Sequence, residues 1–152
     1  MPFRWQRLRI FWSFFAAEVV HRKVSMTALT YQAYAQDIRD RAFEFACQIV
    51  EYCDDLMARG GVGQILAPPM LRCGTSIGAN LEEARGGESR RDFISKCSIA
   101  LKEARESLFR LRVADRCQLG PKGNATALAG EASELAAIIG AIVRNARCNL
   151  AL

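Results

Sequence analysis

Residues 71–112 read LRCGTSIGANLEEARGGESRRDFISKCSIALKEARESLFRLR, and this stretch decides the fold class. On both sides of Gly86-Gly87, apolar or small residues recur at alternating steps of three and four, the spacing of one buried helix face. The glycine pair ends the first helix, and Ser89 followed by Asp92 resembles a capping box that begins the second. The stretch therefore predicts two consecutive amphipathic helices joined by a short turn.

The same spacing continues in both directions and predicts four helices. They cover about residues 37–58, 68–85, 89–119 and 124–147, with Pro68-Pro69 in the first turn of the second helix. Four amphipathic helices with short connections pack most simply as an all-α, antiparallel up-down-up-down four-helix bundle. The predicted core residues are Ile38, Ala42, Phe45, Ile49, Tyr52, Leu56, Met70, Gly74, Ile77, Leu81, Ala84, Phe93, Cys97, Ala100, Ala104, Leu108, Leu111, Ala132, Leu135, Ile139, Ile142 and Ala146.

Length and charge predict one folded domain at residues 37–150, preceded by an extension at residues 1–36. A chain of 152 residues supports one core, and 51% apolar residues exclude disorder of the whole chain. The net charge is +5, but the extension contains five basic residues and one acidic residue. The rest contains 16 basic and 15 acidic residues, so net charge alone is weak evidence for a nucleic-acid partner.

The extension combines Arg4, Arg7 and Arg9 with the apolar run IFWSFFAA at residues 10–17. This run resembles part of a secretory signal, but it has no clear cleavage site and is far shorter than the roughly 18 residues of a membrane span. Two hypotheses remain. The extension is an arm that docks on a partner or a membrane surface, or the natural chain starts at Met26. We expect a cytoplasmic protein without a transmembrane helix.

The sequence lacks the motifs of common enzymes and metal sites. His21 is the one histidine, and there is no GxSxG, HExxH or helical ExxH motif. RGGVGQ at residues 59–64 lacks the lysine and hydroxyl of a phosphate-binding loop, so we interpret it as a turn. Six cysteines without a CxxC pair, mostly in helical segments, indicate reduced packing thiols. We therefore expect no enzymatic activity, no cofactor and no metal.

The third predicted helix has one basic flank. On a wheel of about 100° per residue, five cations project between about 100° and 180° from Phe93. Four acids project between about 220° and 280°: Glu88, Asp92, Glu103 and Glu106. Cations arranged around an aromatic residue can follow a phosphate backbone and stack a base. The alternative is a solvated face whose arginines pair with acids of neighbouring helices or subunits. The candidate nucleic-acid-binding residues are Arg91, Lys102, Arg105, Phe109, Arg112 and Arg116.

The second predicted helix has a polar stripe formed by Arg72, Ser76, Asn80 and Glu83, about 125° from its apolar face. Gly74 and Gly78 in the same helix would let another backbone come close. The stripe is either a contact site for a partner or a hydrogen-bond network that fixes the register of neighbouring helices or subunits.

Additional apolar residues lie away from the predicted core on the first and third helices. A second apolar face on a small protein usually marks an interface, so we expect a homo-oligomer. The candidate interface residues are Phe43, Val50, Ile99, Phe109 and Val113, with Cys47 beside them.

The quoted stretch resembles the four-helix bundle family encoded in intervening sequences of bacterial 23S ribosomal RNA genes. The resemblance rests on Ser76-Ile77-x-Ala79-Asn80, on Glu83 and the serine-initiated DFI segment at 92–94, and on IALKEARE at 99–106. RAFEFACQIV at residues 41–50 is similar to the first helix of the family, and the resemblance covers about residues 37–147. The family includes relatives among the accessory proteins of diversity-generating retroelements, which bind a reverse transcriptase and nucleic acid. The resemblance implies an oligomer, expected to be a pentamer, with an RNA-linked role.

Two functional hypotheses follow. In the first, the chain is a non-enzymatic oligomeric bundle that binds structured RNA or a ribonucleoprotein through the basic flank of the third helix. In the second, it is a protein scaffold or accessory subunit, for example of a retroelement reverse transcriptase. Pro68-Pro69 and the nearly neutral bundle depart from the family pattern, and the second departure weakens the transfer of nucleic-acid binding from the retroelement proteins.

Overall fold

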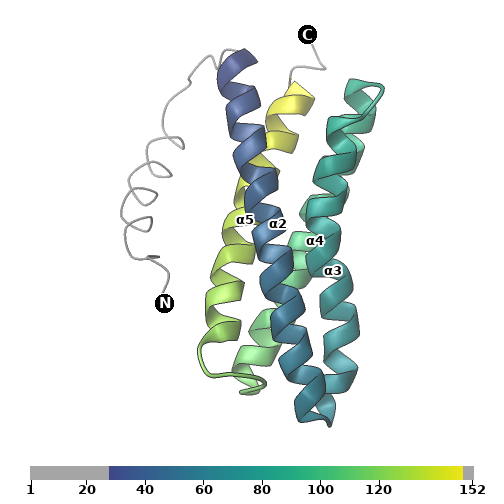
Figure 1. The fold of residues 1–152 in the computed structure, drawn as a ribbon. Helices are drawn as coiled ribbons and strands as arrows, with labels where there is room; N and C mark the ends of the chain where they lie inside the picture. The colour runs from purple at the N-terminus through teal and green to yellow at the C-terminus, as the bar shows by residue number, and fades with distance from the viewer. Residues whose placement is uncertain (1–27, 149–152) are drawn as a thin grey trace. The chain divides into compact units, whose positions relative to one another are not determined.

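The computed structural model describes residues 28–148, and their side chains from Ile38 onward. These residues form four α-helices and no strand: α2 (Ala28–Arg59), α3 (Val62–Arg85), α4 (Arg90–Arg116) and α5 (Asn124–Cys148) (Figure 1). The all-α prediction is confirmed, and the arrangement is that of an antiparallel four-helix bundle. The chain divides into two compact units, and the bundle belongs to the second, which begins at Tyr34. The first turns of α2, Ala28–Ala33, belong to the first unit.

Three predicted helix boundaries are wrong. The first helix begins at Ala28 rather than near residue 37, because ALTYQAYAQ at residues 28–36 lacks glycine and proline and lets an established helix extend. The third helix ends at Arg116, short of Leu119. The third error concerns the prolines of α3. Met26 and the apolar run at 10–17 lie outside the described residues.

Pro68 and Pro69 lie inside α3, which begins six residues earlier at Val62. Two prolines remove the amide donors that would bond to the carbonyls of Gln64 and Ile65. Both of these residues are exposed, so water can satisfy their carbonyls. The helix therefore runs through the proline pair, and the turn that begins it is Gly60-Gly61, where both residues have positive φ.

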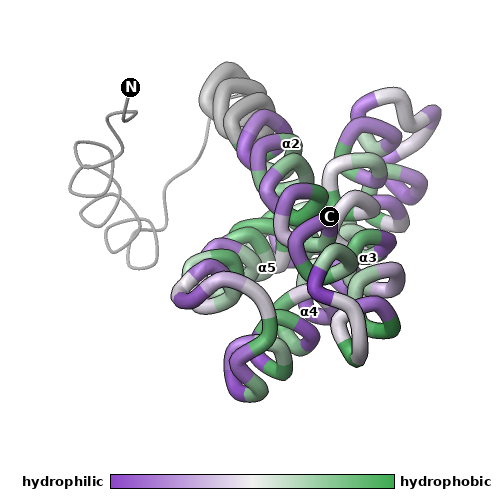
Figure 2. The backbone as a smooth tube through the Cα atoms, turned by 60° about the horizontal axis from the view of Figure 1, so that its bottom comes forward, coloured by the Kyte–Doolittle hydropathy of each residue, from purple (hydrophilic) through white to green (hydrophobic). Residues whose placement is uncertain are grey.

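Each helix packs against two others. Contacts join α3 to α4 and α4 to α5. The thiol of Cys53 in α2 donates to the carbonyl of Ala67 in α3 at 3.5 Å, and Arg41 in α2 donates to Glu131 in α5 at 2.5 Å. The helices therefore surround one core in the order α2, α3, α4, α5, as Figure 2 shows from near one end.

The predicted core is confirmed with few exceptions. Of the predicted residues, only Phe93 and Leu108 are partly exposed, and both pack against the buried cluster. Gly74 and Gly78 do admit a close neighbour, but that neighbour is α2 of the same chain. A Cβ on Gly74 would lie 2.7 Å from Cγ2 of Ile49, and one on Gly78 would lie 3.6 Å from the carbonyl oxygen of Ala42.

The turns are fixed by side-chain contacts. The hydroxyl of Ser89 accepts a hydrogen bond from the amide of Asp92 at 3.1 Å, which confirms Ser89 as the N-cap of α4. Between α4 and α5, the hydroxyl of Tyr52 donates to the carbonyl of Leu119 at 2.7 Å. Gly120 has a φ of 76°, and a Cβ there would lie 2.7 Å from the Tyr52 ring, so glycine is required for two reasons.

Candidate nucleic-acid interface

The basic flank of α4 reaches the surface along the whole helix. Its five cations are all exposed, and none forms an ion pair or a side-chain hydrogen bond with a described residue. Phe109 lies among them with 67% of its surface exposed. The cations are therefore not used to hold the bundle together. They are Arg91, Lys102, Arg105, Arg112 and Arg116.

Two carboxylates of α4, Glu106 and Asp115, in contrast accept hydrogen bonds within the bundle. Glu106 accepts hydrogen bonds from Arg110 at 2.7 Å and from Arg72 of α3 at 3.2 Å. Asp115 accepts a hydrogen bond from Thr126 of α5 at 2.5 Å, whereas Oε2 of Glu103 is buried without a hydrogen-bond partner among the described residues. Glu106 and Asp115 are therefore paired within the bundle, while the five cations of the basic flank have no ion-pair partner among the described residues.

The polar stripe of α3 makes contacts within this chain. Its two ends bind α4, because Arg72 pairs with Glu106 and Glu83 pairs with Lys96 at 2.5 Å. The bond to Glu83 raises the pKa of Lys96. Between these ends, the Asn80 amide donates to the carbonyl of Ser76 one turn earlier, at 2.8 Å. These contacts fit a network that fixes the register of α3 and α4.

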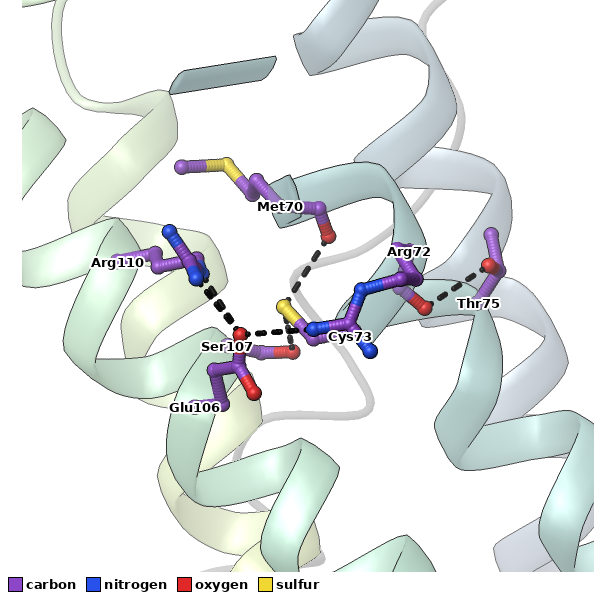
Figure 3. A network of polar contacts seen from close by, with 7 residues as sticks. All are labelled: Met70, Arg72, Cys73, Thr75, Glu106, Ser107 and Arg110. Carbon is purple, nitrogen blue, oxygen red and sulfur yellow. Dashed lines mark hydrogen bonds and ion pairs between the residues drawn. The ribbon is translucent and has the colours of Figure 1, made fainter. Parts of the chain in front are cut away.

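A buried polar contact lies beneath this network (Figure 3). The hydroxyl of Ser107 in α4 donates to the Cys73 sulfur at 3.2 Å, and the Cys73 thiol donates to the carbonyl of Met70 at 3.3 Å. Ser107 is fully buried. The sequence prediction missed it, because a serine on an otherwise apolar face carries no separate signal. Burial raises the pKa of Cys73, so this thiol remains protonated near neutral pH.

Two arginines of α5 lie beside the basic flank, and the sequence prediction missed both. Arg147 donates to the hydroxyl of Ser98 in α4 at 3.3 Å. Nη1 of Arg144 lies 3.5 Å from the point where a Cβ on Gly140 would stand, and a Cδ atom of Leu101 in α4 lies 3.8 Å from that point. Both guanidinium groups therefore lie at the seam between α4 and α5.

Comparisons with known proteins show which family the chain belongs to. The model of the 23S rRNA-intervening sequence protein family matches residues 35–141. The chain belongs to this family. A solved structure of a protein of unknown function from the S23 ribosomal protein family of Bacteroides thetaiotaomicron is 32% identical, with a TM-score of 0.66, and the match covers 73% of this chain and 98% of that one. No curated protein matches.

The family match covers the basic flank of α4 and the polar stripe of α3, but it ends before Arg144 and Arg147. The matched region therefore contains α3, α4 and the candidate interface residues predicted from the sequence.

The predicted oligomer-interface residues lie on the surface, to different extents. Phe43 is 69% exposed, Val50 48% and Phe109 67%, whereas Ile99 and Val113 are partly buried. Because α2 and α4 each pack against α3 and α5, Phe43 and Phe109 lie on opposite sides of the bundle. The prediction missed three further exposed apolar residues, Met57, Val62 and Ile65.

The cysteines that the structure describes are all free. Cys53, Cys73 and Cys97 are buried and fill the core, while Cys117 and Cys148 are exposed. Within residues 28–148, no cluster of three or more histidine, cysteine or acidic side chains is placed to hold a metal ion.

Proposed function

We propose that this chain is a cytoplasmic, non-enzymatic bundle that assembles into an oligomer and binds structured RNA or a ribonucleoprotein through the basic flank of α4. The observation that carries the proposal is the set of five exposed cations without an ion-pair partner among the described residues. Unpaired cations in a row are suited to phosphate contacts, which supply most of the affinity in sequence-independent binding.

Assembly into an oligomer would raise the affinity for RNA by repeating a weak binding site. A single bundle offers few phosphate contacts, but copies in a closed oligomer present the same flank repeatedly to one RNA. The family name, which refers to a sequence within 23S rRNA, is consistent with an RNA-linked role. A pentamer is the oligomer that the family resemblance implies.

The test of the proposal removes three cations together by Arg105→Gln, Arg112→Gln and Arg116→Gln. We expect weaker binding of a fluorescent RNA stem-loop with single-stranded flanks, and a salt dependence reduced by about 0.7 to 0.9 per lost phosphate contact. The melting temperature should not change, because all three side chains are exposed and unpaired.

The control removes charge elsewhere, by Arg59→Gln and Arg85→Gln. Both residues are exposed and form no ion pair with a described residue, and they lie at the ends of α2 and α3. The control should bind the RNA nearly as well as the original chain. Equal affinity and equal salt dependence for the original chain and the α4 variant would refute RNA binding by this flank.

The second candidate function is a scaffold for another protein, such as a reverse transcriptase encoded nearby. Phe109, at 67% exposure, favours this candidate, because large exposed aromatics often anchor protein interfaces. Under this hypothesis, capture of the partner survives the arginine substitutions and is lost in Phe109→Asp or Val113→Asp. Capture that survives both kinds of substitution would exclude this surface.

A further inference from the structure

The cations of α4 are unevenly spaced along the helix. Arg91 and Lys102 are eleven residues apart, which corresponds to about 16 Å at 1.5 Å per residue. Beyond Lys102 the row continues with Arg105, Arg112 and Arg116. A row formed by α4 alone would therefore leave several successive phosphates of a bound backbone without a contact.

The two arginines of α5 lie at the level of this gap. Arg147 is hydrogen-bonded to Ser98, and the guanidinium of Arg144 lies near Leu101. Ser98 and Leu101 lie between Arg91 and Lys102 in α4. Lys96, the cation of α4 in this interval, is paired with Glu83 of α3, so the antiparallel packing of α5 places two cations where the basic flank of α4 has none.

We propose that Arg144 and Arg147 complete one continuous row of seven cations, and that this row binds the phosphate backbone of an RNA duplex. The inference rests on the proposed function and adds both the missing residues and the class of RNA. From Arg91 to Arg116 the row extends about 38 Å along α4, so it can contact several successive phosphates of a duplex backbone.

The composition of the row favours a duplex over a single strand. Sites for single strands rely on several aromatic side chains that stack successive bases. Among the described residues beside this row, Phe109 is the one exposed aromatic side chain. Double-stranded RNA is recognised mainly through its shape, phosphates and 2′-hydroxyls. Ala137, two turns before Arg144 in α5, is small and exposed, so a duplex can approach the cations on both helices without meeting a long side chain there.

The acidic groups near the row do not oppose this binding. Asp115 lies at the α4–α5 seam and is engaged with Thr126. Glu131 and Glu134 point from α5 to Arg41 of α2, on the other side of the helix. These three carboxylates are therefore engaged within the bundle and do not compete for the cations of the row.

The test uses the double variant Arg144→Gln, Arg147→Gln in the full chain. We expect affinity for a 20-base-pair RNA duplex to fall about tenfold at moderate salt and the salt slope to decrease, because two phosphate contacts are lost. Glutamine at 147 can still donate to Ser98, so the melting temperature should be preserved. The control, Arg59→Gln with Arg85→Gln, removes equal charge from the end of α2 and of α3 and should change affinity less than twofold.

The probes separate this inference from the proposed function. If the α4 triple variant loses affinity for the duplex while the α5 double variant does not, the inference is overturned and the proposed function stands. Tighter binding of a 20-nucleotide single strand, or of a DNA duplex of the same sequence, would overturn the assignment to duplex RNA. No binding of any RNA by the original chain would overturn both.

Discussion

Gly74 shows how closely α2 and α3 approach, because any side chain at this position meets the buried Ile49 within 3 Å. Gly74→Ala should therefore lower the free energy of unfolding by about 1–3 kcal/mol, despite the better helix propensity of alanine. Urea denaturation measures the change. Gly130→Ala is the matched control, since Gly130 is exposed in α5 with open space around it, and it should raise stability by about 0.5–1 kcal/mol. A stabilising Gly74→Ala would refute the close packing.

Buried thiols are expected to lower the stability of the bundle as the pH rises into the alkaline range. Burial raises the pKa of Cys97 to about 11, and burial together with the nearby Cys73 raises that of Cys53 to about 11. In the unfolded chain these thiols ionise near pH 9. Between pH 9 and 11 the unfolded state therefore binds fewer protons than the folded state, and stability falls as pH rises.

The thiol prediction is tested by urea denaturation at pH 7, 9 and 10 for the original chain and Cys97→Ala. The variant should be less stable at pH 7, because the substitution removes a buried sulfur, but its stability should decline less steeply above pH 9. Equal slopes for the two proteins would show that Cys97 ionises alike in both states.

At the scale of the helix, Ser89 fixes where α4 begins. Ser89→Ala removes the hydroxyl that accepts the amide of Asp92, so we expect a loss of about 1 kcal/mol in unfolding free energy. Ser95 is an exposed serine inside the same helix, and Ser95→Ala should change stability by less than about 0.5 kcal/mol. Thermal denaturation distinguishes the two. Similar small effects for both would mean that the N-cap contact contributes nothing.

Helix periodicity predicted the core because each seam, such as Ile38 to Leu56, is a local property of one helix. It misplaced the start of α3, because the cost of Pro68-Pro69 depends on whether the freed carbonyls reach water, and this depends on tertiary structure. The same limit applies to the interface. The flank of α4 could be predicted from one helix, whereas the contribution of Arg147 depends on its contact with Ser98 in another.

At the scale of the whole molecule, the surface charge is divided between opposite sides. The outer face of α2 has five exposed carboxylates that form no ion pair with a described residue, beside the exposed Phe43 and Val50. Across the bundle, α4 exposes its cations beside Phe109. The carboxylates are Asp40, Glu44, Glu51, Asp54 and Asp55. This complementarity would allow head-to-tail contacts rather than a symmetric dimer, and in such contacts α2 of one copy would cover the α4 face of the next and compete with RNA for its cations.

Two single variants test this arrangement by light scattering coupled to size exclusion. In a head-to-tail assembly, Phe43→Asp and Phe109→Asp should each yield monomers, because each destroys one of the two complementary faces. An equimolar mixture should form dimers, because the first variant retains the α4 face and the second retains the α2 face. Symmetric contacts predict instead that each variant alone still forms dimers, because each keeps one self-complementary face. Ala127→Asp, which adds the same charge at an exposed position of α5, should leave the assembly of the original chain unchanged.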